Sequence, residues 1–148
     1  MSNKIILLVE DDPNDVLLIQ RAFQKAGLAD SLKVVNDGDE AIEYLTGHGR
    51  FDDRSLFPLP YLLLLDLKMP GTDGFEVLRW ARNQENLKRL LIVVLTSSNL
   101  QADVDRAYEL GANSYLVKPV GFDALTDLVR ILQGYWVAWN EKPEIEPA

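Results

Sequence analysis

The sequence predicts a single α/β domain built on a doubly wound, mainly parallel sheet of five strands. Five short apolar runs alternate with helical patterns along the chain. The runs are continuously apolar, which is typical of strands buried on both faces of a parallel sheet. With 148 residues and 47 % apolar content, the chain is long enough for one hydrophobic core and short for two. The expected strands are KIILLV (4–9), SLKVV (31–35), YLLLLD (61–66), LLIVVL (90–95) and SYLV (114–117).

Helical patterns fill the segments between these strands. An apolar stripe after the first strand predicts a helix that ends near Gly27. Asp37 and Asp73 are start signals for two further helices, and Gly111 is a stop signal. This alternation predicts the flavodoxin-like fold, with five helices, strand order 2-1-3-4-5 and an extended C-terminal helix. The later helices are expected over 38–46, 74–84, 101–110 and 121–138.

Composition argues against several classes of function. The chain has 23 Asp and Glu against 15 Lys and Arg, a net charge of -8, which disfavours binding to nucleic-acid phosphates. It has no cysteine, which excludes disulfides and cysteine-ligated zinc and suits a reducing compartment. No segment approaches the roughly 20 apolar residues that a membrane span needs. We therefore expect a cytoplasmic protein with neither a nucleic-acid nor a membrane partner.

Polar residues stand at the carboxyl ends of four expected strands. Asp66 ends the third strand, the acidic run 10–12 follows the first, Thr96 ends the fourth and Lys118 follows the fifth. In doubly wound sheets, ligands bind outside these strand ends, where the strand order reverses. We therefore expect these side chains to face one crevice.

The residue types in this crevice predict a metal site and phosphoryl chemistry. Carboxylates from Glu10, Asp11 and Asp66 brought together repel one another, so they need a raised pKa or a cation. Oxygen ligands alone suit a hard ion such as Mg²⁺. Asp66 could act as a nucleophile that forms an aspartyl phosphate, with Lys118 and the Thr96 hydroxyl contacting the phosphoryl oxygens.

Each of these features has a simpler explanation when it is taken alone. Acidic residues after a strand often cap the next helix, a Lys-Pro pair is usually a loop, and Thr-Ser-Ser is commonly a cap. The simpler explanation requires four independent coincidences, because all four features end strands of one predicted sheet. The common placement therefore favours a functional site.

Four segments together resemble the motifs of the response-regulator receiver domain of two-component signalling. The resemblance runs from about residue 4 to residue 133, in the family's motif order and spacing. It implies that Asp66 is the phosphoacceptor and a ligand of Mg²⁺. The other expected contacts of the ion are Asp11, Glu10 through water, and the backbone carbonyl of Lys68. The segments are ILLVEDDPND, LLLLDLKMPGTDGFEVL, VVLTSS and GANSYLVKP.

The same resemblance implies how a signal leaves the site. Thr96 is the expected switch hydroxyl, Lys118 the phosphate-binding lysine, and Tyr115 the aromatic residue that rotates inward, although a half-buried strand aromatic is an alternative for Tyr115. The bistable surface comprises the fourth helix, fifth strand and fifth helix. The family also implies a cis Lys118–Pro119 bond. We therefore expect a signalling switch rather than a metabolic enzyme, phosphorylated by a sensor histidine kinase.

Two segments differ from a minimal receiver domain. The connection over 46–61 exceeds the usual ~2–6 residues, and its His48, flanked by glycines, is expected to be an exposed loop residue. Together with the C-terminal helical extension, this loop resembles response regulators paired with cyanobacterial phytochromes, which implies a phytochrome-type kinase. We expect the receiver domain to span 1–140 and to be followed by a disordered acidic tail, 141–148, with no output domain.

The last helix ends in a cluster of aromatic residues. Tyr135, Trp136 and Trp139 lie where the pattern becomes apolar on all sides, and aromatic residues are enriched at interfaces. They are candidates for a homodimer interface, although packing back over the sheet edge or the long loop is an equal alternative.

Three other functions are possible for such a fold. An aspartate-nucleophile phosphatase usually has a second carboxylate two residues after the first, where this chain has Lys68. A flavin or nucleotide binder needs a glycine-rich turn, and the first strand is instead followed by EDDPND. A receiver-fold interaction module that acts without phosphorylation is the remaining alternative.

Overall fold

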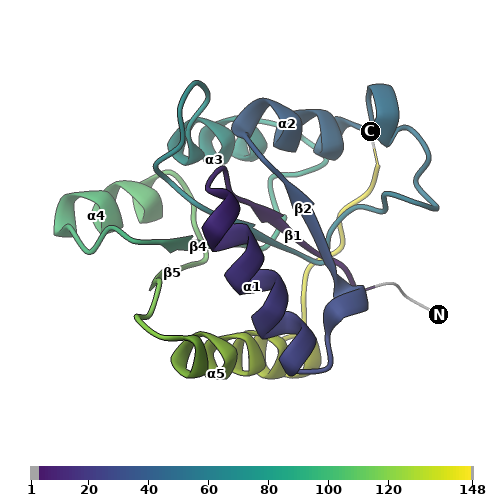
Figure 1. The fold of residues 1–148 in the computed structure, drawn as a ribbon. Coiled ribbons are helices and arrows are strands. Elements are labelled where there is room, and N and C mark those ends of the chain that lie inside the picture. Colours follow the sequence, from purple (N-terminus) through teal and green to yellow (C-terminus); the bar gives the residue numbers. More distant parts are fainter. Residues whose placement is uncertain (1–3, 148) are drawn as a thin grey trace.

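The computed structural model describes residues 4–147 and places a five-stranded parallel sheet between two layers of helices (Figure 1). The strand order is β2-β1-β3-β4-β5, as predicted for the flavodoxin-like fold. From β1 the chain crosses over to β2 on one side of it, and from β2 it returns to β3 on the other side of β1. The strand order therefore reverses between β1 and β3, and the switch point of the sheet lies between these two strands. The strands are β1 (Ile6–Val9), β2 (Leu32–Val35), β3 (Leu62–Leu65), β4 (Ile92–Thr96) and β5 (Ser114–Val117).

Five α-helices follow the strands, and three of them begin at an aspartate that caps the helix. The carboxylates of Asp12, Asp37 and Asp73 accept hydrogen bonds from backbone N–H groups in the first turns of α1, α2 and α3. The last helix continues as a π-helical segment, η3 (Gln133–Trp139), so the predicted C-terminal extension is present. The helices are α1 (Pro13–Lys25), α2 (Gly38–Thr46), α3 (Gly74–Arg82), α4 (Gln101–Glu109) and α5 (Phe122–Leu132).

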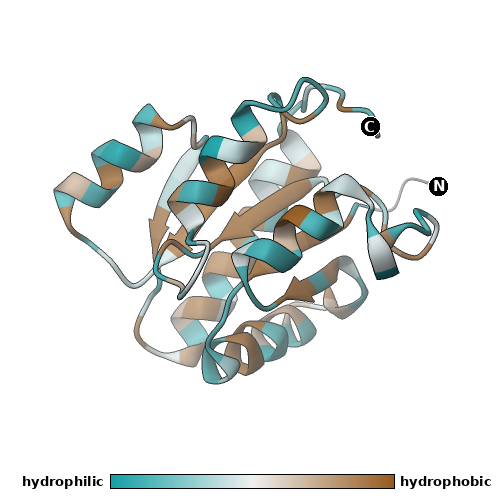
Figure 2. Ribbon diagram, turned by 90° about the horizontal axis from the view of Figure 1, so that it is seen from above, coloured by the Kyte–Doolittle hydropathy of each residue, from teal (hydrophilic) through white to brown (hydrophobic). Residues whose placement is uncertain are grey.

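The leucine run of β3 is explained by two apolar cores, one on each face of the sheet. Leu63 and Leu65 belong to the core covered by α2, α3 and α4, whereas Leu62 and Leu64 belong to the core covered by α1 and α5. All four side chains are buried. In Figure 2 the strands are mostly apolar, while the helices carry hydrophilic residues on their outer faces. Within residues 4–147, no helix has the length and apolar content needed to cross a bilayer.

The 46–61 connection packs as an ordered aromatic cluster. Phe51 is buried, and its ring centroid lies 5.0 Å from that of Tyr44 and 5.1 Å from that of Phe57. The Arg54 guanidinium donates hydrogen bonds to the carbonyls of Tyr44, Leu45 and Phe57 at 2.7 to 3.1 Å, which satisfies the C-terminus of α2. His48 is exposed, in agreement with its interpretation as a loop residue.

The acidic C-terminal segment has no regular secondary structure, but it follows a defined path along the domain as far as residue 147. It crosses from the α5 layer to the α2 layer (Figure 1). Ile145 packs against the core covered by α2 and α3, and the Asn86 side chain donates to the Glu146 carbonyl at 3.0 Å. The Lys142 ammonium lies 5.2 Å from the Tyr61 ring centroid. These contacts differ from the expectation of a disordered tail, because one apolar side chain anchors the segment.

Candidate phosphoacceptor site

Strand register brings the predicted site residues together. Val9, the last residue of β1, lies opposite Leu65, the last residue of β3. The residues that follow these strands, Glu10 and Asp66, therefore lie side by side. Thr96 closes β4, and Lys118 follows β5, whose last residue is in register with Thr96. These residues, with Asp11, Asp12, Asp15, Lys68 and Ser97, line one cleft of about 240 Å³. The structure therefore forms the crevice that the sequence predicted at the switch point.

A close approach of backbone fixes Asp66 relative to helix α3. Gly74 begins α3, and a Cβ atom at this position would lie 2.1 Å from the Asp66 carbonyl oxygen. Only glycine lets the helix approach the strand end so closely. The Asp66 side chain is held as well, because its Oδ1 accepts a hydrogen bond from the Leu67 N–H at 2.8 Å. Oδ2 is left to face the cleft, 3.6 Å from the Lys118 ammonium.

Three carboxylates of the cleft form a group suited to a cation. Oxygen atoms of Glu10, Asp11 and Asp66 lie within 4.8 Å of one another, with Glu10 and Asp66 buried and Asp11 half-buried. Burial raises the pKa of Glu10 to about 7, and the neighbouring Asp66 adds to this rise while Lys118 opposes it. An all-oxygen donor set that is partly open to solvent fits a hard divalent ion. The residues present therefore suit the expected Mg²⁺.

Lys118 provides the cation of the cleft. Its ammonium group contacts the Glu10 carboxylate and lies 2.9 Å from Asp15 Oδ2. Burial lowers the pKa of Lys118, but hydrogen bonds to Glu10 and Asp15 outweigh burial, and the resulting pKa is above its ordinary value. Lys118 is therefore charged at any pH at which the protein would function, and it faces Asp66 Oδ2 directly.

Thr96 has an unused hydroxyl. The residue is 1 % exposed, and its Oγ1 is buried without a hydrogen-bond partner among the described residues. A buried polar atom of this kind is costly and calls for an explanation. Because Thr96 lines the same cleft as Asp66, an acceptor bound there would satisfy the hydroxyl.

Tyr115 lies behind Thr96 on the neighbouring strand. It is half-buried, packs against the core, and its hydroxyl donates to the Ser98 carbonyl at 2.9 Å. Burial raises the pKa of this phenol. These contacts fit both a switch residue and a half-buried strand aromatic, so the switch role stays a prediction.

Sequence reasoning missed one residue of the cleft and misjudged one bond. Asp15 was assigned no role. The cap at Asp12 places Asp15 in the first turn of α1, where its carboxylate contacts Lys118. The Lys118–Pro119 peptide was expected to be cis, but the described residues contain no cis peptide. The metal contact expected from the Lys68 carbonyl stays a prediction, although Lys68 does line the cleft.

A family comparison agrees with this geometry. The model of the response regulator receiver domain matches residues 6–130, which include every strand and the whole cleft. The chain belongs to this family. Receiver domains are the signalling switches of two-component systems, and they work with histidine kinases.

Two curated relatives are similar to this chain over most of their length and of its own. It is 42 % identical to the probable methanogenesis regulatory protein FilR2 of Methanothrix harundinacea (strain 6Ac), over 94 % of this chain and 87 % of the relative. It is 37 % identical to response regulator Rcp1 of Synechocystis sp. (strain ATCC 27184 / PCC 6803 / Kazusa), over 90 % and 89 %.

Two solved structures are similar to this chain over nearly its whole length. The phosphorylated cyanobacterial phytochrome response regulator RcpA has a TM-score of 0.87 at 34 % identity, covering 97 % of this chain and 100 % of that chain. The Mn²⁺-bound form of Rcp1 has a TM-score of 0.82 at 35 % identity, covering 95 % and 99 %.

Proposed function

We propose that this receiver accepts a phosphoryl group on Asp66 from a phosphohistidine of a partner kinase, in the presence of Mg²⁺. The observation that carries the proposal is the environment of Asp66. One carboxylate oxygen is held by the Leu67 N–H, and the other faces the cleft between the Lys118 ammonium and the Glu10–Asp11 pair. This arrangement presents a single oriented nucleophile beside groups that neutralise charge.

The chemistry follows from this arrangement. Asp66 Oδ2 attacks phosphorus, an O–P bond forms as the N–P bond to the donor imidazole breaks, and the imidazole nitrogen keeps the electron pair and takes a proton from solvent. Lys118 stabilises negative charge on the transferred oxygens, and the Thr96 hydroxyl donates to one of them. A magnesium ion held by Glu10, Asp11 and Asp66, with the Lys68 carbonyl, would supply further charge neutralisation when bound.

The proposed output is a change of the surface formed by α4, β5 and α5. A phosphoryl oxygen would draw the Thr96 hydroxyl toward Asp66, and Tyr115 would move behind it. The alternative, an interaction module that works without phosphorylation, leaves the buried Thr96 hydroxyl and the crowded carboxylates without a purpose.

Intact mass after incubation with acetyl phosphate tests the phosphoacceptor. We expect one acid-stable, base-labile adduct in the parent chain, lost without Mg²⁺ and lost in Asp66→Asn. A matched control is Asp105→Asn. Asp105 lies on the exposed face of α4, and among residues 4–147 its carboxylate accepts a hydrogen bond only from Gln101. Absence of the adduct in the parent would favour the constitutive module, and an adduct that survives in Asp66→Asn would identify a different acceptor.

We also propose a phytochrome-type histidine kinase as the donor. Support comes from the similarity to Rcp1 and RcpA over nearly the whole chain, including the C-terminal extension. The test is the rate of phosphotransfer from a purified, autophosphorylated phytochrome kinase and from an unrelated histidine kinase. Transfer from the phytochrome kinase should be faster by at least about 100-fold, which corresponds to about 2.7 kcal/mol. Equal rates would contradict this assignment.

A homodimer through the C-terminal helix is the third part of the proposal. Tyr135 and Trp139 are 54 % and 83 % exposed, whereas Trp136 is half-buried and packs against the core covered by α1 and α5. The candidate interface is therefore narrowed to Tyr135, Trp139 and the neighbouring Ile131, which is 66 % exposed. Light scattering should report a dimer for the parent and a monomer for Trp139→Ser, with Leu100→Ser, on another exposed site, as the control. A dimer that persists in Trp139→Ser would exclude this interface.

A further inference from the structure

The side chain of Lys68 turns away from Asp66 and contacts helix α4. Its ammonium lies 3.1 Å from Asp103 Oδ2, although Lys68 stands only two residues after Asp66 and lines the same cleft. The Ser98 hydroxyl donates to the same Asp103 oxygen at 2.6 Å. Lys68, Ser98 and Asp103, here called the α4 cluster, therefore join the connection after β3 to the first turn of α4.

The α4 cluster also reaches the expected switch residues. Ser98 is two residues after Thr96, its hydroxyl accepts from the Leu100 N–H at 3.3 Å, and its carbonyl accepts from the Tyr115 hydroxyl at 2.9 Å. Because Ser98 contacts all three elements, a displacement of Asp103 would be transmitted through Ser98 to the β4–α4 loop and to β5. This contiguity gives the cluster a physical route to the proposed output surface.

The Asp103 carboxylate has other stabilising neighbours besides Lys68, so Lys68 can leave the α4 cluster. The hydrogen bond from Ser98, followed by that from Lys68, holds the pKa of Asp103 below its usual range, and the charge of Arg106 acts in the same direction. Arg106 lies on α4 one turn after Asp103, with its guanidinium 4.1 Å from the Phe75 ring centroid. Asp103 would therefore keep a hydrogen-bond donor and a nearby cation after losing Lys68.

We propose that Lys68 exchanges partners, binding Asp103 while Asp66 is unmodified and binding a phosphoryl oxygen once Asp66 is phosphorylated. This inference rests on the proposed function of Asp66. A phosphoryl group carries about −1.5 to −2 charge near pH 7 and three acceptor oxygens, so it competes well with one carboxylate. The Lys68 side chain is 58 % exposed and flexible, so the exchange needs only a change of rotamer. Its consequence is that the first turn of α4 loses its contact with the connection after β3.

Asp103 is then a positioning residue whose removal favours the phosphorylated state. A partly exposed ion pair is worth about 0.2–1 kcal/mol. If Asp103 withholds Lys68 from the site, loss of the pair raises the fraction of molecules ready to bind a phosphoryl group. The apparent affinity for such a group should rise by about 1.5- to fivefold.

The experiment is a titration with beryllofluoride, a phosphoryl analogue, at saturating Mg²⁺, followed by NMR. We expect Asp103→Asn to bind it about 1.5- to fivefold more tightly than the parent, and Lys68→Met to bind it more weakly. The double variant Asp103→Asn/Lys68→Met should match Lys68→Met, because Asp103 acts only through Lys68. Asp105→Asn, on the same helix, is the matched control and should equal the parent.

A second measurement distinguishes positioning from a general structural effect. Mg²⁺ affinity without beryllofluoride should be the same in the parent and in Asp103→Asn, because the exchange requires a phosphoryl group. Tighter binding that persists in the Lys68→Met background, or no tightening in Asp103→Asn, would overturn the exchange. Failure of the parent to form an Asp66 adduct in the mass experiment would instead overturn the proposed function, so the two failures are distinguishable.

Discussion

The two ends of the parallel sheet are built on opposite physical principles. At the carboxyl end, buried carboxylates of Glu10 and Asp66 share one cation, Lys118, and a buried hydroxyl has no partner within residues 4–147. At the amino end, the 46–61 loop packs with Tyr44 into an aromatic cluster in which Arg54 and the Tyr44 hydroxyl find their hydrogen-bond partners.

This contrast shows that the amino end of the sheet contributes to the stability of the fold, whereas the carboxyl end lowers it. Clustered carboxylates repel one another, and the repulsion is strong where two of them are buried, so the carboxylate group at the carboxyl end weakens the fold. Packed aromatic rings and satisfied carbonyls strengthen it. Substitutions at the two ends should therefore have effects of different kinds, and the following three experiments test that difference.

The largest effect is expected where the carboxyl end depends on close backbone packing. Gly74→Ala would place a Cβ 2.1 Å from the Asp66 carbonyl oxygen, so α3 must shift away from β3. We expect the free energy of unfolding to fall by about 3 kcal/mol, the upper end for overpacking. Chemical denaturation measures this loss. Gly134→Ala is the control, because a Cβ there meets nothing within 4 Å, and equal losses in both variants would contradict the packing argument.

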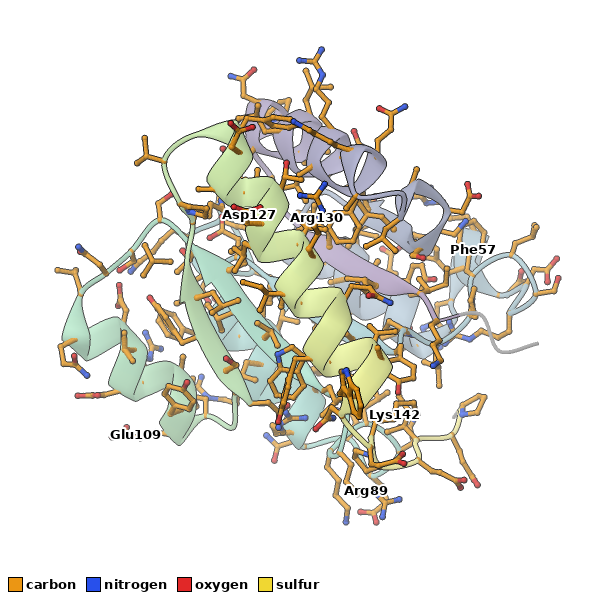
Figure 3. All side chains as sticks on the ribbon, turned by 90° about the horizontal axis from the view of Figure 1, so that it is seen from below. Phe57, Arg89, Glu109, Asp127, Arg130 and Lys142 are labelled. Atoms are coloured by element: carbon orange, nitrogen blue, oxygen red, sulfur yellow. The ribbon has the colours of Figure 1, made fainter. Side chains whose placement is uncertain are left out.

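The next effect belongs to the amino end. Arg54→Ala removes the guanidinium that donates to two carbonyls at the end of α2 and to the Phe57 carbonyl in the loop, so the free energy of unfolding should fall by about 2 kcal/mol. The yield of phosphorylated protein should be unchanged, because the cleft does not include this loop. Arg89→Ala is the control, since Arg89 is exposed and extends from the surface, as Figure 3 shows. A loss of phosphorylation in Arg54→Ala would show that the loop at the amino end and the cleft at the carboxyl end do not act independently.

The smallest effect has the opposite sign. Glu10→Gln removes one charge from the carboxylate group while keeping the shape of the side chain, so metal-free protein should gain about 1–2 kcal/mol of stability. Mg²⁺ affinity should fall at least about tenfold in the same variant. Thermal unfolding in EDTA and a magnesium titration measure the two changes. Glu109→Gln, at the exposed C-terminal end of α4 (Figure 3), should alter neither. A loss of stability in metal-free Glu10→Gln would show that repulsion among the carboxylates does not weaken the fold.

Much of the fold and of the site could be predicted because both follow from local patterns. Continuous apolar runs such as 61–66 indicate strands buried on both faces, and the order of the motifs placed Asp66, Thr96 and Lys118 at strand ends. The partners of Lys68 and Asp15 could not be predicted in this way. Asp103 is 35 positions from Lys68 (103 − 68), and no periodicity relates an exposed lysine to a helix that follows another strand.

The C-terminal region shows the same division. Its aromatic composition indicated burial or an interface, but only packing separates half-buried Trp136 from exposed Tyr135 and Trp139. The tail was expected to be disordered because it is short and acidic, and one side chain, Ile145, anchors it to the core. Anchoring by a few dispersed contacts leaves little trace in composition.

By itself, the sequence determined the alternation of strands and helices, the strand ends that carry carboxylates, and the capping aspartates, since each depends on neighbouring residues and on backbone geometry. The tertiary structure alone decided the oxygen of Asp66 that faces the cleft, the carboxylates that share Lys118, and the contact of Lys68 with Asp103. The reason is physical. These contacts join residues from different strands and helices, and their distances are set only when the sheet register and helix packing are in place.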